Sequence, residues 1–574
     1  MHHFLNDISM VFAGEAGQGL QTVTETLLRI LAKSGYNVFS CTEYMSRIRG
    51  GCNTTEIRIT DKKQRAYLER IDMLFALSPL AVEHLKSRIN SGTLIFAEKS
   101  QFAERWDERY IDTPFRRFAV ETGSPVFSNT VAAGTVFGMI GLPFERFTDY
   151  LGEQFAAKGE DTVSKNCMAA KLGYDFGRLI AADKAILLPS PALTGSSGRL
   201  LMDGNSALGI GAIAAGCNFI SSYPMSPGTG LLTFLAARSK AFGIVVDQAE
   251  DEIAAVNAGI GASYCGARAI VTTSGGGFDL MQEGVSLAGM IETPIVIHIA
   301  QRPGPATGLP TRTEQGDLNL ALHAGHGDFA RAILAPGTLE ELAESMQHAF
   351  TLAHCFQIPV FVLTDQYLLD AVTTIERRDI KRLPAETAVI KTGAGYQRFL
   401  FTDDGLSPRG VPGYGDGLVR VDSDEHDENG LITESFEMRA RMVEKRLKRM
   451  KPLAEAALMP SIIGSIKEAD VVVIAWGSNR GVLEEAIEIL GNKRVAGIHF
   501  SQLFPLNPDV KSLLEKRALV VMENNAAGQF ADLLSLQTGL SIAHRIVKTT
   551  GEPFSVEEVA EALSAFKESK RARP

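Results

Sequence analysis

Three consecutive acids, Glu250, Asp251 and Glu252, stand before a helix-like run that consists almost entirely of small residues. Unsatisfied backbone amides and the helix dipole favour acids in a first helical turn. A helix start is therefore the plainest explanation of this cluster. A chemical role requires other polar groups that meet the acids in the fold, so the neighbouring loops decide between the two interpretations.

Two loops near the acids carry hydroxyl groups and glycines directly after β-rich runs. In "SSYPMSPGTG", prolines restrict the backbone and would hold Ser226 and Thr229 still. In "VTTSGGGFDLMQE", Ser274 precedes Gly275 and Gly276, where a backbone could approach a ligand closely. Ordinary strand-exit turns would give the same patterns.

A third loop, "IAQRPGPATGLPTRTEQGDL", places Arg302, Thr307 and Arg312 in a stretch that glycines and prolines make rigid. Guanidinium groups bind carboxylates in a bidentate geometry, although single surface arginines usually mean little. Ligands of open α/β sheets bind outside the carboxyl ends of the strands. Because all these loops follow strands of one predicted sheet, we expect them to converge on one substrate site.

The amino-terminal segment contains a strand, the glycine-rich turn "GEAGQG" and a helix. Amides at the start of that helix could hold a phosphate, but a lysine with serine or threonine for a P-loop is absent, so a structural turn is an equal alternative. The cationic segment "SRIRGGCNTTEIRI" favours a nucleotide with several phosphates, such as coenzyme A. The candidate residues are Gly14, Gly17, Gly19, Arg47, Arg49 and Gly50, with Arg58 and Gly51 in the same segment.

The sequence predicts no metal site in this chain. The six cysteines are scattered, without a Cys-x-x-Cys pair, and are expected to be small buried thiols. The Gly-Asp-Gly at Gly415 to Gly417 could suggest a Mg²⁺-diphosphate motif, but its asparagine, Asn429, follows too soon and lies in an acidic stretch.

Composition limits the class of protein to which this chain can belong. Its 574 residues, 45% hydrophobic and 22% charged, are typical of a multidomain globular protein. A net charge of −10 argues against a nucleic-acid partner. Neither a membrane-spanning run nor a signal peptide is recognisable, so we expect a cytoplasmic protein.

Alternation of β-rich and helical runs predicts an α/β fold with three α/β domains, the second of them doubly wound. We expect the acidic run "DSDEHDE" and the basic helix "FEMRARMVEKRLKRMK" of the connector to be solvated faces. The predicted divisions are a first domain over 1–182, a linker over 183–202, a second domain over 203–370, a connector over 371–460 and a third domain over 461–574.

Several long motifs in one order resemble the α subunit of 2-oxoacid:ferredoxin oxidoreductases. They are "YPMSPGTG", "EDEIAAVNAGIGASYCGARAIVTTSGGGFDLMQE", "AQRPGPATGLPTRTEQGDL" and "VDSDEHDENGLITE". The amino-terminal "GEAGQG" and "SRIRGG" resemble the γ subunit of the same enzymes, here fused ahead of α. The fusion is most similar to the 2-oxoglutarate (KorA) type.

The resemblance implies a γ-type domain, a domain that binds the pyrimidine of thiamine diphosphate, and a C-terminal domain like that of transketolase. It implies conversion of 2-oxoglutarate and coenzyme A to succinyl-CoA and CO₂, with electrons passed to ferredoxin, or the reverse reaction that fixes CO₂. A KorB-type β subunit would hold the diphosphate, Mg²⁺ and a [4Fe-4S] cluster, in an (αβ)₂ assembly.

The resemblance also implies roles for single residues. An acid hydrogen-bonded to the pyrimidine ring selects the tautomer whose amino nitrogen can act as a base, and it must be buried and fixed. The family motif places this glutamate nine residues before a helix glycine, which selects Glu250 with Gly259. Ser226 matches a substrate-binding hydroxyl that is usually threonine, and Arg302 and Arg312 are candidates for the substrate carboxylates.

Other hypotheses stay open at the sequence level. The substrate could be pyruvate or another 2-oxoacid, the chain could be a non-catalytic nucleotide-binding or regulatory subunit, or it could be a self-sufficient transketolase-like enzyme. The "ENNAAGQ" run, Glu523 to Gln529, resembles a family motif to which the sequence assigns no chemistry.

Overall fold

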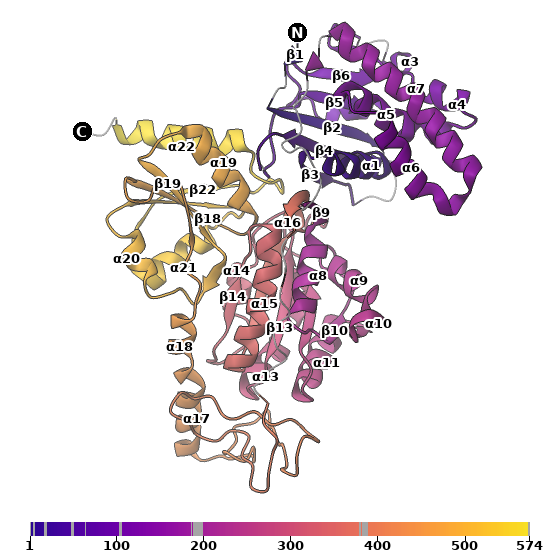
Figure 1. Cartoon of the computed structure of the whole chain (residues 1–574). Helices are drawn as coiled ribbons and strands as arrows, with labels where there is room; N and C mark the ends of the chain where they lie inside the picture. The colour runs from indigo at the N-terminus through magenta and orange to yellow at the C-terminus, as the bar shows by residue number, and fades with distance from the viewer. Residues whose placement is uncertain are drawn as a thin grey trace. The chain divides into compact units, whose positions relative to one another are not determined.

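The computed structural model describes residues 2–3, 6–15, 20–46, 51–63, 65–102, 106–184, 186–187, 199–377, 380 and 389–571. The chain divides into two compact units (Figure 1). Unit 1 contains residues 1–202, 371–378 and 555–557, and unit 2 contains residues 203–370, 379–554 and 558–574. None of the helices described is long and apolar enough to cross a membrane.

Unit 1 is built on a mixed sheet of eight strands in the order β7-β6-β5-β2-β4-β3-β16-β9. The predicted β-α-β beginning is present as β2, α1 and β3, but β4 lies between the two strands and is antiparallel to both. The sheet is therefore not purely parallel. The strands are β2 (Asp7–Glu15), β3 (Asn37–Glu43), β4 (Cys52–Thr60), β5 (Met73–Ala76), β6 (Leu94–Ala97), β7 (Tyr110–Asp112), β9 (Arg199–Asp203) and β16 (Val372–Glu376).

Both faces of this sheet are buried, since alternate residues of β2 join two different hydrophobic clusters. The short strands β1 (His2–His3) and β8 (Ile186–Leu187) form a separate parallel pair. The α-helices of the unit are α1 (Leu20–Lys33), α2 (Pro79–His84), α3 (Lys99–Phe102), α4 (Phe115–Glu121), α5 (Ser128–Ile140), α6 (Glu145–Phe155) and α7 (Glu160–Lys184).

Glycines allow α5 and α7 to pack with their backbones in close contact. A Cβ at Gly134 or Gly138 of α5 would collide with the α7 backbone, and one at Gly173 or Gly177 would collide with α5. Small residues at such a crossing bring two helices nearer than larger side chains permit.

Unit 2 contains a sheet of seven strands in the order β11-β10-β12-β13-β15-β14-β20, of which all but β20 run parallel. Its strands are β10 (Phe219–Ser222), β11 (Val245–Gln248), β12 (Ala269–Thr273), β13 (Ile295–Gln301), β14 (Ala332–Leu334), β15 (Pro359–Asp365) and β20 (Gln502–Phe504). Its helices are α8 (Gly204–Ala214), α9 (Thr229–Ala236), α10 (Ser239–Phe242), α11 (Glu252–Tyr264), α12 (Gly275–Leu280), α13 (Gln282–Met290), α14 (Leu318–Leu322), α15 (Leu339–Phe356) and α16 (Gln366–Asp370).

A second sheet of unit 2 has five strands in the order β17-β19-β18-β21-β22. The strands are β17 (Ser461–Ile463), β18 (Val471–Trp476), β19 (Val495–Phe500), β21 (Ala518–Glu523) and β22 (Ile542–Val547). The helices that belong to the connector or flank this sheet are α17 (Phe436–Lys448), α18 (Met450–Glu455), α19 (Arg480–Leu490), α20 (Val510–Leu514), α21 (Gln529–Thr538) and α22 (Val556–Arg571).

The α/β fold class is as predicted, whereas the domain boundaries stay a prediction. Two strands pair with a sheet outside the predicted division in which they lie. β16, expected in the connector, pairs with β3 in the sheet of unit 1. β20, expected in the third domain, pairs with β14 in the seven-stranded sheet. One continuous hydrophobic cluster also contains residues of both unit 2 sheets, so these sheets share a core.

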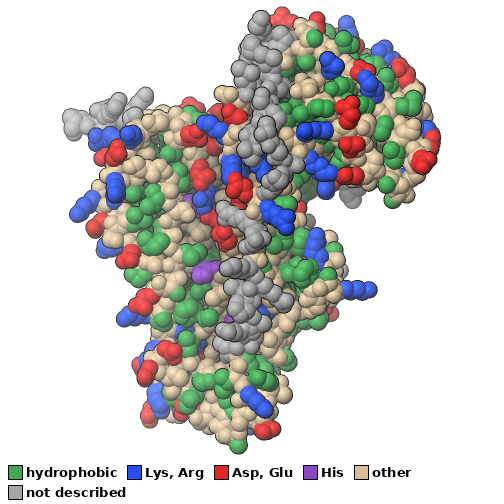
Figure 2. Space-filling model, viewed as in Figure 1, with side chains coloured by type: hydrophobic (Ala, Val, Ile, Leu, Met, Phe, Trp, Pro, Cys, Tyr) green, Lys and Arg blue, Asp and Glu red, His purple; other side chains and the backbone are tan. Residues whose placement is uncertain are grey.

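Buried ion pairs fix the connector, contrary to the expectation that its charge runs are solvated. Glu292, fully buried, binds Lys445 Nζ at 2.7 Å and Arg449 Nη2 at 2.6 Å. Burial alone would raise the pKa of Glu292, but Arg449 and Lys445 hold it well below its usual value. In the acidic run, Glu425 binds Arg446 at 2.9 Å. On the face shown in Figure 2, acidic and basic side chains are otherwise interspersed.

The cysteines differ from the expected buried thiols. Cys52 and Cys217 are buried, but Cys265 and Cys355 are exposed. The Gly-Asp-Gly stretch has a packing reason, because a Cβ at Gly415 or Gly417 would collide with the backbone at Thr392 and Gly393.

Candidate active site

The loops singled out in the sequence meet at one edge of the seven-stranded sheet. Strands β10, β12 and β13 are parallel neighbours, so their carboxyl ends lie side by side. We call this region the carboxyl-edge site and define it by Ser226, Glu252, Ser274 to Gly277, Arg302 and Asp317. Such an edge is where open α/β sheets bind ligands.

The three acids before α11 have three different surroundings. Glu250 is exposed and precedes the helix. Asp251 is the N-cap, and its Oδ1 accepts a hydrogen bond from the Ala254 amide at 2.7 Å. Glu252 is the first helical residue and only 3% exposed. The expectation that Glu250 is buried and fixed is therefore wrong, because the chain buries a carboxyl group only once the helix has begun.

Glu252 presses against the glycine turn that follows β12. A Cβ at Gly277 would lie 2.6 Å from Glu252 Oε1, so any larger residue there would displace the carboxylate. Within the described part of the chain, Oε1 is buried without a hydrogen-bond partner, and so is the Ser274 hydroxyl. Gly259 of α11 packs on β12, where a Cβ would approach Val271 to 2.7 Å.

A second carboxyl group lies at the other end of this turn. A Cβ at Gly275 would collide with both carboxyl oxygens of Asp317, while Gly276 between the two ends is exposed. Burial raises the pKa of Asp317 to about 7, with Glu314 acting in the same direction and Arg302 against it.

Arg302 joins two of the predicted loops. Its Nη1 donates a hydrogen bond to the Ser226 carbonyl at 2.7 Å. The glycine turn reaches the same loop, since a Cβ at Gly276 would lie 3.9 Å from the Ala306 carbonyl oxygen. The structure thus brings Ser226, Arg302 and the Gly275–Gly277 turn together, as the sequence predicts.

Thr307 and Arg312 lie further along the loop that begins at Arg302. Thr307 is exposed. Arg312 is partly exposed, and its Cβ faces Gly551, whose carbonyl accepts a hydrogen bond from the Thr313 amide at 3.1 Å. Their part in substrate binding stays a prediction.

A buried histidine, which no sequence motif indicates, links three strands of the seven-stranded sheet near this edge. His298 of β13 is fully buried, and its ring nitrogens bind Thr272 Oγ1 and Thr364 Oγ1, each at 2.8 Å. The Thr272 hydroxyl donates a hydrogen bond to the Gly228 carbonyl at 3.1 Å and therefore accepts one from His298 Nδ1. The proton of the neutral ring is thus on Nδ1. Burial lowers the pKa of His298 to about 3.

The five-stranded sheet holds the loop that carries Asp317. Gln315 Nε2 donates to the Trp476 carbonyl at 2.8 Å, and the Gln315 Oε1 accepts from Asn479 at 2.9 Å and from the Asn524 amide at 3.1 Å. The Gln315 amide donates to the Asn524 carbonyl at 2.8 Å, and Asn525 Nδ2 donates to the Gln315 carbonyl at 3.1 Å.

Gln315 therefore occupies the place where a ligand would be expected in that sheet. After β18 the chain forms β19 on one side of that strand and then β21 on the other side. The order of strands therefore reverses between β18 and β21. Trp476 ends β18 and Asn524 follows β21. Ligands of open α/β sheets bind at such switch points, and here a loop of the same unit fills it.

This arrangement gives the "ENNAAGQ" run a structural role. Glu523 is buried and accepts hydrogen bonds from Trp476 Nε1 at 3.2 Å, Asn525 Nδ2 at 3.0 Å and the Phe530 amide at 2.8 Å. It fixes both the indole ring and the start of α21. Asn525 is thereby oriented toward the Gln315 backbone.

Unit 1 has its own cavity, of about 720 Å³, near the carboxyl ends of its parallel strands. The strand order reverses between β2 and β5, and the Leu77 amide donates to the Ala13 carbonyl there at 2.9 Å. Gly14 belongs to β2, whereas the other candidates, Gly17, Gly19, Arg47, Arg49 and Gly50, lie outside the described residues. The cavity is lined by Leu77, Thr113, Arg116 and Asn129, among others.

Arg58 does not belong to an accessible cationic segment. It is buried in β4, and its guanidinium binds Asp7 at 2.8 Å and donates to the Ala66 carbonyl at 3.0 Å. The alternation of a strand turns it inward.

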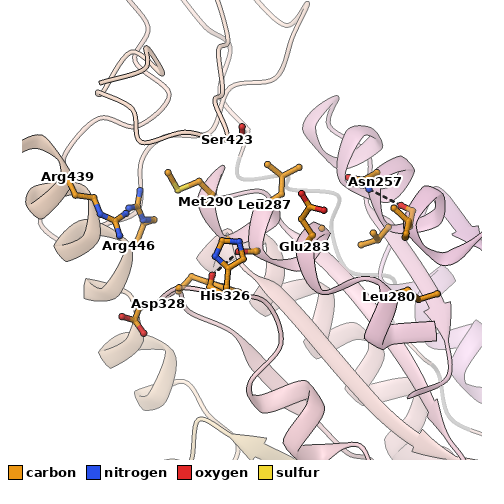
Figure 3. Close-up of a pocket in the computed structure, with 17 residues that line it drawn as sticks. Asn257, Leu280, Glu283, Leu287, Met290, His326, Asp328, Ser423, Arg439 and Arg446 are labelled. Carbon is orange, nitrogen blue, oxygen red and sulfur yellow. Dashed lines mark hydrogen bonds between the residues drawn. The ribbon is translucent and has the colours of Figure 1, made fainter. Parts of the chain in front are cut away.

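Another cavity, of about 640 Å³, is lined by residues of α11, α13 and α17 (Figure 3). Asn257, Glu283 and Leu287 line it from these helices, His326 lies beside α13, and Arg439 faces them from α17. It combines apolar and charged groups of both signs.

Comparisons with known proteins identify the family. The family of pyruvate flavodoxin/ferredoxin oxidoreductases, thiamine diphosphate-binding, matches residues 210–445, and the pyruvate ferredoxin/flavodoxin oxidoreductase family matches residues 9–176. The 2-oxoacid:ferredoxin oxidoreductase subunit alpha of a Sulfolobus species is 31% identical, over 97% of this chain and 96% of that protein. The chain belongs to the 2-oxoacid:ferredoxin oxidoreductase α-subunit family.

Relatives within this family carry 2-oxoglutarate in their names. The 2-oxoglutarate oxidoreductase subunit KorA of Mycobacterium tuberculosis is 26% identical, over 98% of this chain and 92% of that protein. The solved structure of 2-oxoglutarate:ferredoxin oxidoreductase from Magnetococcus marinus, with 2-oxoglutarate, coenzyme A and succinyl-CoA bound, is 28% identical with a TM-score of 0.88. That comparison covers 98% of this chain and 99% of the other.

Proposed function

We propose that this α subunit acts with a KorB-type β subunit on 2-oxoglutarate. The products are succinyl-CoA and CO₂, and two electrons pass to ferredoxin; the reaction is reversible. The proposal rests most directly on the site at Glu252, where a buried carboxylate oxygen faces a glycine turn and has no hydrogen-bond partner among the residues that the structure describes. The proposal keeps the cytoplasmic location expected from the sequence and an (αβ)₂ assembly.

The residues at the carboxyl-edge site fit the pyrimidine half of thiamine diphosphate. When bound, this cofactor supplies the nucleophilic carbon and the electron sink that decarboxylation of a 2-oxoacid requires. Glu252 Oε1 would accept a hydrogen bond from a ring nitrogen and keep a proton there. Gly276 leaves the backbone accessible between the two ends of the turn, and Ser274 offers a second polar atom. The β subunit would contribute the diphosphate site, Mg²⁺ and the [4Fe-4S] cluster.

Substrate recognition would depend on the loop after β13. Arg302 can bind one carboxylate of a 2-oxoacid, and its bond to the Ser226 carbonyl holds the two loops together. A dicarboxylate such as 2-oxoglutarate has a second anionic end, for which Arg312 and Thr307 are the candidates on the same loop. The KorA-named relative and the Magnetococcus enzyme support this substrate.

Coenzyme A would bind to unit 1 as the second substrate. The cavity of about 720 Å³ lies where the strand order reverses, which is the usual place for a nucleotide in an open sheet. Arg116, which lines this cavity, carries a positive charge that could bind a phosphate. The candidate phosphate-binding residues of the glycine turn begin with Gly14 at the end of β2.

The decisive experiment measures substrate-dependent reduction of a viologen dye by the chain purified with its β subunit. Pyruvate, a branched-chain and an aryl 2-oxoacid are compared with 2-oxoglutarate, each with and without coenzyme A. We expect the highest kcat/KM with 2-oxoglutarate and dependence on coenzyme A. Equal kcat/KM with pyruvate would remove the substrate assignment, and absence of turnover with every acid would favour a non-catalytic subunit.

A further inference from the structure

The proposed function assigns a role to one of the two carboxyl groups at the glycine turn and leaves the other without one. Glu252 adjoins Gly277, and Asp317 adjoins Gly275 at the opposite end. Within the described residues, Asp317 Oδ2 is also buried without a hydrogen-bond partner. A buried polar atom that has lost its contact with water is costly unless it finds a partner, so this second carboxyl group requires an explanation.

The backbone around Asp317 is fixed by side chains from two other segments. Its amide donates to Gln301 Oε1 at 3.0 Å. Gln529 Nε2 donates to the Gly316 carbonyl at 2.8 Å, and Gln529 Oε1 accepts from the Asn319 amide at 2.9 Å. Because the residues before and after Asp317 are both held, its carboxyl group has a defined position against Gly275.

The charged groups that face Asp317 are Arg302, from the start of the loop, and Glu314. Arg302 attracts an anionic ligand to this part of the site. An ionised Asp317 would repel the same ligand, whereas a protonated one would offer it a hydrogen bond. Burial and Glu314 favour the protonated form and raise the pKa of this carboxyl group to about 7, so its charge changes near neutral pH.

We propose that Asp317 is a second functional carboxyl group of the carboxyl-edge site and that, in its protonated form, it donates a hydrogen bond to an oxygen of the anionic 2-oxoacid held by Arg302. This inference rests on the proposed function and adds a residue to substrate recognition. Asp317 then makes binding of the anion dependent on pH, since deprotonation replaces a donor with a repelling charge.

The test compares the αβ complex containing the wild-type chain with complexes carrying Asp317→Asn or Glu314→Gln. The asparagine variant can still donate a hydrogen bond but cannot ionise. Above about pH 7, we expect the wild-type kcat/KM for 2-oxoglutarate to fall about tenfold per pH unit, through a rising KM. The Asp317→Asn profile should lack this fall, and Glu314→Gln should move the wild-type break to lower pH.

Two outcomes would overturn the inference. Equal pH dependence in the wild type and the Asp317→Asn variant would show that Asp317 does not control binding. Loss of activity in Asp317→Asn at every pH, through kcat, would show that hydrogen-bond donation is not its role.

A measurement without turnover keeps this inference separate from the proposed function. Folding raises the pKa of Asp317 above the value of an unfolded aspartate, so wild-type stability should decrease as pH rises from about 4 to about 7 and then level off. The melting temperature of the wild-type chain relative to Asp317→Asn should follow this course. If that difference does not vary with pH, Asp317 has an ordinary pKa and the inference fails, whether or not the complex turns over a 2-oxoacid.

Discussion

At the scale of single residues, burial distinguishes carboxylates that are neighbours in the sequence. Glu250, Asp251 and Glu252 all carry carboxylates. Glu250 is exposed, Asp251 caps a helix, and Glu252 is buried against Gly277. Control of a ring tautomer needs a carboxylate that is shielded from water and held in one position. We therefore assign that role to Glu252 as part of the proposed function.

This assignment gives a matched pair of variants that differ only in position. In the αβ complex, we expect Glu252→Gln to lower kcat about 100-fold or more, because an amide cannot keep a proton on the ring nitrogen. Glu250→Gln should retain near wild-type kcat, since its side chain is exposed. Steady-state dye reduction measures both, and thermal melting checks that each variant folds. The reverse pattern would restore Glu250 as the functional acid.

At the scale of elements, the five-stranded sheet anchors a loop of the carboxyl-edge site, which lies on the seven-stranded sheet. Its switch point holds Gln315, and Gln315 holds the loop between Arg312 and Asp317. We expect Gln315→Ala to raise the KM for the 2-oxoacid several-fold while changing kcat less, because the loop loses its anchor and not its charged groups.

The same change should cost about 1–3 kcal/mol of stability, because it leaves buried partners unsatisfied. Gln537→Ala is a suitable control, since that amide accepts one hydrogen bond from the Leu506 backbone at 3.3 Å and is exposed. The anchor would have no functional part if Gln315→Ala changed melting temperature without altering KM.

At the scale of the whole molecule, the two compact units have separate cores, while the two sheets of unit 2 share one. Cores of this kind unfold as cooperative units. We expect calorimetry of the full chain to resolve two transitions. Gly138→Ala, which forces a Cβ into the α7 backbone, should lower the melting temperature of the unit 1 transition only.

Glu292→Gln should destabilise only unit 2 and lower its free energy of unfolding by about 3–5 kcal/mol. Lys445 and Arg449 would be left as buried charges without their anion. Lys448→Ala removes an exposed pair with Glu444 and should change neither transition by more than about 0.5 kcal/mol. A single transition that all three variants shift together would contradict the division into two unfolding units.

Much of the site is local information that the sequence carries. Strand-end loops with Ser226, Ser274 and Arg302 can be recognised because glycine, proline and hydroxyl residues directly follow β-rich runs. Parallel strands then bring such loops to one edge. The sequence does not distinguish His298 or Asp317, since a lone histidine in an apolar run and an aspartate in a polar loop have many ordinary explanations.

The α/β class, the order of the motifs and the family can be inferred from the sequence alone, because periodicity and motif spacing are read along the chain. Three features emerge only from the packed chain: which carboxylate is buried, the position of Asp317 opposite Glu252, and the insertion of Gln315 at the switch point of another sheet. Burial, close approach and hydrogen bonds between segments more than 150 residues apart depend on how elements pack, and a local pattern does not record that packing.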